Sequence, residues 1–123
     1  MEFKSQICTS VEQSKRLLEL GLKKETADMA HNKNTIIPKY KIIQVQDWEL
    51  LTELEEVTYI PAWSLHRLLF LIPKEVNIDG FKFPLRSDAI MRLEDADHIY
   101  ERLIGIIERV IKEGYLNKDY LEE

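Results

Sequence analysis

Apolar residues recur at helical spacing in several separate stretches of the chain, and the first stretch has clear boundaries. Thr9 or Ser10 can cap a helix, because each is followed three residues later by Glu or Gln, the spacing of a capping box. Gly21 stands where helices commonly end in the left-handed conformation. The pattern predicts a helix over residues 11–20, and the polar residues 31–35 predict an exposed loop after it.

The middle of the chain alternates between β-rich and helical patterns. Residues 36–46 are rich in Ile, Val and Tyr, a composition that favours a strand. Apolar residues at helical spacing then predict a short helix over 48–56, and residues 59–63 are expected to break it. Ser64 is well placed to cap a further helix, which Pro73 ends.

The helix after Ser64 is apolar around almost its whole circumference. Its inward stripe consists of four residues, Leu65, Leu68, Leu69 and Ile72. Phe70 and Leu71 lie outside that stripe, and a helix this apolar must be deeply buried or meet a partner. Because so small a domain has few further layers, we expect Phe70 and Leu71 to contact a second copy in a two-fold homodimer. The alternative is that the chain itself encloses this helix.

The strongest local signal in the second half of the chain is a hairpin. Asp79-Gly80 separates two short runs of alternating apolar residues, which is the pattern of a two-residue β-turn. A second turn at residues 86–88 could return the chain as a third strand through Ile90 and Leu93. The result would be a small antiparallel meander.

The longest helix comes last. Asp95 is placed to cap a helix over residues 96–113, and Gly114 follows as its left-handed end residue. Gly105, inside this helix, predicts close packing against another element. Residues 117–123 are expected to form a frayed tail.

Length and composition place these elements in a single domain, residues 1–123. The chain has 123 residues, of which 45% are apolar, with four Gly and four Pro. The order of elements predicts the α+β class, with about four helices packed on a small antiparallel sheet, either a hairpin or a three-stranded meander. No signal peptide or membrane-spanning run is visible, and the single Cys8 favours a reducing compartment. We therefore expect a cytoplasmic protein without membrane contact.

Charge narrows the range of partners. The net charge is −5, from 17 basic and 22 acidic residues, and no dense basic cluster occurs, so direct nucleic-acid binding is not expected. An acidic run lies between Lys41 and Arg67 and contains Asp47, Glu49, Glu53, Glu55 and Glu56. It is interpreted either as an exposed helix face or as a negative patch that meets a basic protein or imitates nucleic-acid phosphate.

Residues that could carry chemistry are few and scattered. Trp48 and Trp63 flank the acidic run, as core anchors or as interface residues. The histidines stand apart from one another, whereas zinc needs three or four ligands; they are His31, His66 and His98. No phosphate-binding glycine loop or nucleophile motif occurs. We expect no catalytic residue, no metal site and no cofactor, and a protein that is not an enzyme.

Two stretches, Thr9–Met29 and Ile60–Pro73, resemble a family of small uncharacterised proteins from prophages and mobile elements of Bacteroides-type bacteria. The first runs Thr9-Ser10-Val11-Glu12-Gln13-Ser14-Lys15-Arg16-Leu17-Leu18-Glu19-Leu20-Gly21-Leu22 and on through Met29. The second begins Ile60-Pro61-Ala62-Trp63-Ser64-Leu65 and ends at Pro73. The resemblance implies a small cytoplasmic α+β protein carried by mobile DNA, and it brings no activity, cofactor or functional residue.

Two functions are compatible with these observations. The first is an accessory protein of phage or mobile-element origin that acts through protein–protein contacts with an unidentified partner and forms a homodimer. The alternative is a small acidic inhibitor that uses the run Asp47–Glu56 to imitate nucleic acid and block a host nucleic-acid-binding protein. The two differ in salt dependence, since only the mimic should bind a basic protein with steep loss of affinity as salt rises.

Overall fold

A computed structural model describes residues 6–32, 41–45, 59–93 and 98–122 of the chain. Within these ranges the α-helices are α1 (Val11–Glu19), α3 (Leu65–Leu71), α4 (Leu85–Arg92) and α5 (Ile99–Lys112). Two single-turn 3₁₀ helices also occur, η1 (Lys24–Thr26) and η2 (Lys118–Tyr120). The strands are β1 (Met29–Asn32), β2 (Lys41–Gln44), β3 (Tyr59–Ala62), β4 (Val76–Ile78) and β5 (Phe81–Phe83). The α+β class with small antiparallel sheets is confirmed.

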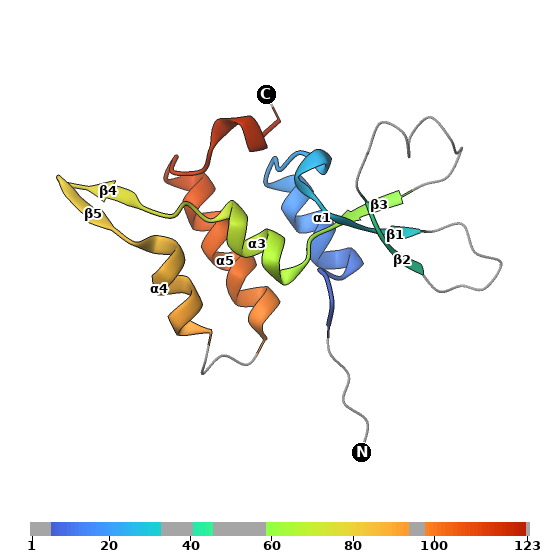
Figure 1. Cartoon of the computed structure of the whole chain (residues 1–123). Helices are drawn as coiled ribbons and strands as arrows, with labels where there is room; N and C mark the ends of the chain where they lie inside the picture. The colour runs from blue at the N-terminus through green and yellow to red at the C-terminus, as the bar shows by residue number, and fades with distance from the viewer. Residues whose placement is uncertain (1–5, 33–40, 46–58, 94–97, 123) are drawn as a thin grey trace, which may run out of the picture.

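The strands form two separate sheets at opposite ends of the molecule. One is three-stranded with the order β2-β1-β3, and the other is the β4-β5 hairpin. Helices α1, α3 and α5 lie between them, and α4 lies beside the hairpin (Figure 1). The helices therefore separate two sheets instead of covering one face of a single sheet.

The three-stranded sheet corrects one expectation, confirms part of another and includes a strand, β3, that was not expected. The loop expected at 31–35 is wrong for residues 31–32, because His31 and Asn32 end the central strand β1 and His31 is buried. Residues 59–62 form an edge strand, where Pro61 is tolerated because it lacks only an outward N–H. The strand expected within 36–46 is found at 41–44. Residues 33–40 and the helix expected at 48–56 lie outside the described residues.

Helices α1 and α5 end in the same way. Ser10 caps α1 through a reciprocal pair of hydrogen bonds with Gln13. Gly21 has φ 102° and Gly114 has φ 78°, and each is followed by a residue whose N–H donates back into the last turn. The left-handed helix ends are thus confirmed. The start of α5 is not: its first residue is Ile99, three positions later than expected, and Asp95 lies outside the described residues.

The hairpin is confirmed, but the expected third strand is wrong. Asp79 and Gly80 have φ of 51° and 85°, as a two-residue hairpin turn requires. The following segment is the helix α4, because Leu85, Ala89 and Leu93 recur every four residues and form a single apolar stripe. The apolar repeat of four residues therefore determines a helix here, and the short alternation that suggested a third strand does not.

An arginine on α4 fixes this helix against α3. The Arg86 Nε donates to the carbonyl of Ile72 at 2.9 Å, and its Nη2 donates to the carbonyl of Phe70 at 2.8 Å. These carbonyls lie at the C-terminal end of α3, where the helix leaves them without intrahelical donors. One side chain therefore satisfies the end of one helix and sets the position of the next.

The core lies where α1, α3 and α5 meet. Its largest fully buried side chains are Trp63, Leu17, Leu22, Leu68, Ile72, Leu103, Ile104 and Ile107. Gly105 does not pack closely against anything, since an added Cβ would meet no atom within 4 Å. That expectation is wrong because the residue lies on the outer side of α5, opposite the buried stripe.

The C-terminal segment is docked, which corrects the expectation of a frayed tail. The N–H of Lys23 donates to the carbonyl of Tyr120 at 2.8 Å, and the N–H of Glu122 donates to the carbonyl of Gly21 at 2.7 Å. Leu121 faces Leu22 in an antiparallel bridge. The segment stays in place because it pairs with backbone groups that follow α1 and would otherwise be open.

Gly105 and Gly114 should respond to alanine in opposite directions. Gly105→Ala is expected to raise the free energy of unfolding by up to about 1 kcal/mol, because alanine restricts the unfolded chain and nothing obstructs its Cβ. Gly114→Ala should lower it by about 1 kcal/mol, because φ is positive there. Urea unfolding measures both. A destabilising Gly105→Ala would contradict the open space beside α5.

Candidate functional site

The helix α3 is enclosed mainly by its own chain. Leu71 is 2% exposed and belongs to the core, so its assignment to a dimer interface is wrong. Trp63 is also fully buried, which confirms the core interpretation and corrects the interface one. Both assignments failed because α4 and α5 supply the second layer that the small size of the domain seemed to exclude. Trp48 lies outside the described residues.

Among the expected interface residues that the structure describes, only Phe70 reaches the surface, with 49% of its area exposed. The guanidinium of Arg86 lies over its ring, 5.4 Å from the centroid. A cation over an aromatic face is itself a favourable contact, and it leaves less bare apolar surface for a partner. The acidic run from Asp47 to Glu56 lies outside the described residues.

A cluster of hydrogen-bonded polar groups lies between the start of α1 and the three-stranded sheet. The Thr9 Oγ1 accepts a hydrogen bond from the Trp63 backbone N–H at 3.0 Å and lies 2.7 Å from the Ser14 hydroxyl. The Trp63 indole N–H donates to Thr26 Oγ1 at 2.9 Å. Asp28 accepts from both the backbone N–H and the hydroxyl of Ser64, at 2.9 and 2.5 Å. These bonds hold the N-terminal segment, η1 and β3 together.

This cluster contains a cysteine close to a histidine, so nucleophilic chemistry has to be considered. The Cys8 Sγ is 4.0 Å from His31 Nε2, but the same nitrogen lies 2.8 Å from the Thr9 carbonyl oxygen. A carbonyl only accepts, so Nε2 carries the hydrogen and cannot take a proton from the thiol. Burial, helped by the charge of Asp28, raises the pKa of Cys8 to about 11. The cysteine is therefore a neutral thiol near pH 7.

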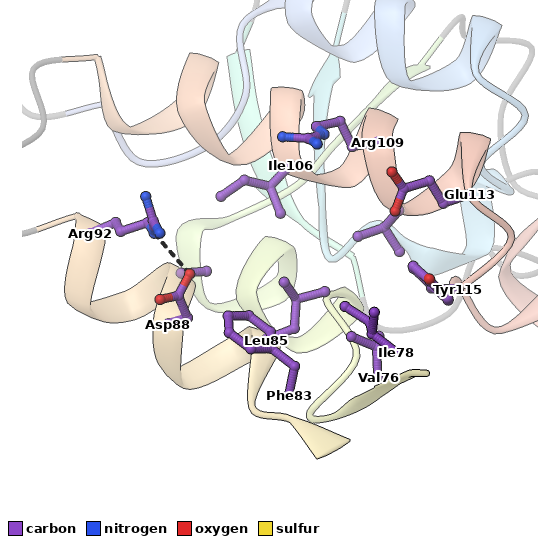
Figure 2. Close-up of a pocket in the computed structure, with 12 residues that line it drawn as sticks. Val76, Ile78, Phe83, Leu85, Asp88, Arg92, Ile106, Arg109, Glu113 and Tyr115 are labelled. Atoms are coloured by element: carbon purple, nitrogen blue, oxygen red, sulfur yellow. Dashed lines mark hydrogen bonds and ion pairs between the residues drawn. The ribbon is translucent and has the colours of Figure 1, made fainter. Parts of the chain in front are cut away.

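An apolar hollow of about 320 Å³ lies between the β4-β5 hairpin, α4 and α5. Figure 2 shows the hairpin residues on one side of it and Ile106 and Arg109 of α5 on the other. Its floor is mostly aliphatic and aromatic, formed by Val76, Ile78, Phe83, Leu85, Ala89, Ile106 and Val110. We call this feature the hairpin hollow.

The rim of the hairpin hollow carries charges of both signs. Arg92 is ion-paired to Asp88, with Nε 2.8 Å from Oδ2 (Figure 2). Arg109 and Glu113 stand on α5, one turn apart, and the ion pairs found among the described residues include neither of them. A surface with an apolar floor and a balanced charged rim is suited to an apolar protein segment more than to a highly charged ligand.

Sequence reasoning located the hairpin but did not recognise its role. Ile78 is 44% exposed and Phe81 is 66% exposed, although both belong to the regular apolar alternation around the turn. The alternation itself was a signal for this exposure. A two-stranded hairpin with one apolar face needs another layer to cover that face, and the sequence names no element that covers it.

The described parts of the chain contain neither a cluster of metal ligands nor a membrane-spanning helix. No group of three or more His, Cys, Asp or Glu side chains there could hold a metal ion. Likewise, none of the described helices combines the length and the apolar character needed to cross a membrane. The hairpin hollow is accordingly the feature on which a functional proposal can be built.

Removing the Thr9 hydroxyl should destabilise the protein strongly. Thr9→Val keeps the shape but leaves the Trp63 N–H without its acceptor in a buried position, at an expected cost of about 2 kcal/mol. Thr9→Ser retains the hydroxyl and should cost clearly less. Urea unfolding of both variants measures the difference, and equal losses would show that the methyl group matters instead.

The buried thiol should make stability depend on pH in alkaline solution. An unfolded cysteine ionises near its ordinary pKa of 9.0, whereas the native Cys8 has a pKa of about 11. Its contribution is fully present below the unfolded pKa and is lost as the pH rises toward the native pKa. Unfolding measured through this range should therefore show a steeper loss for the wild type than for Cys8→Ala. Identical pH profiles would contradict the raised pKa.

Comparisons with known proteins found no relative of this chain. No protein-family model matches the chain, and neither a curated protein nor a solved structure matches it. The arrangement of its own residues is therefore what a proposal about function has to rest on.

Proposed function

We propose that this protein is a non-enzymatic accessory protein that acts through protein–protein contacts, and that the hairpin hollow is its contact surface. The observation that carries the proposal is the exposure of Ile78 and Phe81 beside the hollow, on the apolar face of the hairpin. Large apolar side chains gathered around a concave apolar floor are typical of surfaces that other proteins cover.

The charge of this surface supports a protein partner over other classes. Asp88, Arg92, Arg109 and Glu113 together carry no net charge at neutral pH, so the rim neither attracts a polyanion nor repels one. Tyr115, at the end of α5, adds a partly exposed aromatic ring to the same surface. Tyrosine and arginine are enriched at protein interfaces, because each combines apolar area with directed hydrogen bonding.

Three finer statements stay predictions. A phage or mobile-element origin and a cytoplasmic location were inferred from the resemblance and from Cys8. The alternative function, an acidic inhibitor that mimics nucleic acid, depends on residues 47–56, which lie outside the described residues. Its distinguishing property remains salt-sensitive binding to a basic protein.

Photo-crosslinking tests whether the hairpin hollow contacts a protein. A benzoylphenylalanine at position 78, on the apolar face, should form a covalent adduct with a protein when irradiated in a lysate of the source cells. The same group at position 82, on the opposite face of the hairpin, is the matched control and should form little or none.

The adduct should be identified by mass spectrometry, and an excess of the unmodified protein added before irradiation should suppress its formation. Either a distinct protein or a second copy of the chain satisfies the proposal if both conditions hold. Failure to form an adduct at position 78 that this competition suppresses, or equal labelling at position 82, would overturn the proposal.

A further inference from the structure

The apolar face of the hairpin is covered at one end and bare at the other. Directly opposed residues of an antiparallel pair share a face, so Val76 and Phe83 lie on the same side as Ile78 and Phe81. Val76 is buried, whereas the exposed fractions rise to 44% at Ile78 and 66% at Phe81. The bodies of α4 and α5 thus cover the base of this face and leave the tip uncovered.

The same molecule therefore presents a projecting apolar group and an apolar depression. Phe81 is the first residue of β5, directly after the hairpin turn. The β4-β5 hairpin projects at one end of the molecule (Figure 1), and the hollow begins at the base of the same hairpin face (Figure 2). If two hairpins approach each other in opposite directions, the tip of each reaches the hollow beside the base of the other. Such a contact is reciprocal, as a two-fold interface requires.

Although the rim as a whole is neutral, such a contact would bring together one pair of opposite charges. The turn at the tip carries Asp79, which lies outside the ion pairs found among the described residues. The side of the hollow away from the hairpin carries Arg109, for which the same holds (Figure 2). When the tip of one copy lies over the hollow of another, the carboxylate approaches the guanidinium, and the two-fold axis repeats the pair. Of the two rim carboxylates, Asp88 is paired with Arg92, and Glu113 is the C-cap residue of α5, one turn beyond Arg109.

We propose that the occupant of the hairpin hollow is a second copy of this chain, with Phe81 of each protomer inserted into the hollow of the other. The inference rests on the proposed function and names the partner for the same surface. Phe81 and Ile78 become covered, the hairpin gains the second layer that it lacks, and Asp79 is placed toward the arginine on the rim.

This dimer differs from one formed through the outer side of α4. Ile90 and Met91 are also exposed, and Met91 reaches 74%, but neither lines the hollow. The two exposed regions can therefore be distinguished with one substitution on each.

Sedimentation velocity over a wide range of concentrations tests the inference. The wild type should form dimers as the concentration rises, and Phe81→Asp should raise the dissociation constant at least about tenfold, because a carboxylate would be placed in an apolar depression. Met91→Asp is the matched control. It adds the same charge at a more exposed apolar site and should leave the dissociation constant within about twofold.

A second pair of variants covers the case in which Phe81→Asp disturbs the hairpin. Arg109→Glu changes only an exposed side chain on the rim and should also weaken the dimer, with unchanged circular dichroism. Asp79→Asn keeps a residue that tolerates the left-handed turn while it removes the charge. Its effect should be smaller in the Arg109→Glu background than alone.

The outcomes separate the two proposals. A wild type that stays monomeric at the highest concentrations overturns the dimer, and so does a dimer that Phe81→Asp and Arg109→Glu leave intact. In either case a crosslink from position 78 to a different protein, suppressed by excess unmodified protein added before irradiation, would still support the proposed function. Loss of both the dimer and the crosslink would overturn both proposals.

Discussion

The burial of Trp63 is the constraint on which the rest of the fold depends. Its backbone N–H and C=O both bond to Thr9, and its indole N–H bonds to Thr26. A buried indole needs an acceptor for its N–H, so the segment around η1 has to lie where that acceptor can be reached. The N-terminal segment, the edge strand β3 and the start of α3 are held together at this one residue.

From that junction the chain continues directly into α3, and α3 determines the rest of the helical layer. Leu68 and Ile72 pack into the core with the buried stripe of α5, and the carbonyls at the end of α3 are bonded by Arg86. The position of α4 follows from those bonds. The hairpin, which joins α3 to α4, is consequently held at the far end of the molecule, with its base on the helices and its tip beyond them (Figure 1).

Local signals predicted those parts of the fold that depend on local interactions. The cap at Ser10, the left-handed ends at Gly21 and Gly114, and the Asp79-Gly80 turn all involve residues within one or two turns of each other. The errors concern contacts between distant segments. Strand β1, with the sequence Met-Ala-His-Asn, has little intrinsic preference for a strand and is defined by its two neighbours. The docked C-terminal segment likewise depends on a backbone edge near Gly21 that no sequence pattern reveals.

The candidate site illustrates the same limit. The alternation of Val76, Ile78, Phe81 and Phe83 predicted a hairpin face. Phe70 and Leu71 were expected to be the surplus apolar residues, and only Phe70 of the two is exposed. Which apolar residue remains exposed depends on how far neighbouring layers extend, and that is a property of tertiary packing. The core covers Leu71 and stops short of Phe81, although both are equally apolar in the sequence.

The bridge between Leu22 and Leu121 has a consequence for synthesis on the ribosome. It joins the end of α1 to a segment that follows α5, so the pairing cannot form until nearly all of the described chain has been made. During that interval the backbone that follows α1 is an open edge, and Leu22 lacks one of its neighbours. Contacts between such distant segments form slowly, and exposed edges are where nascent chains associate wrongly. Slow elongation would therefore lengthen the period in which this protein is prone to aggregate.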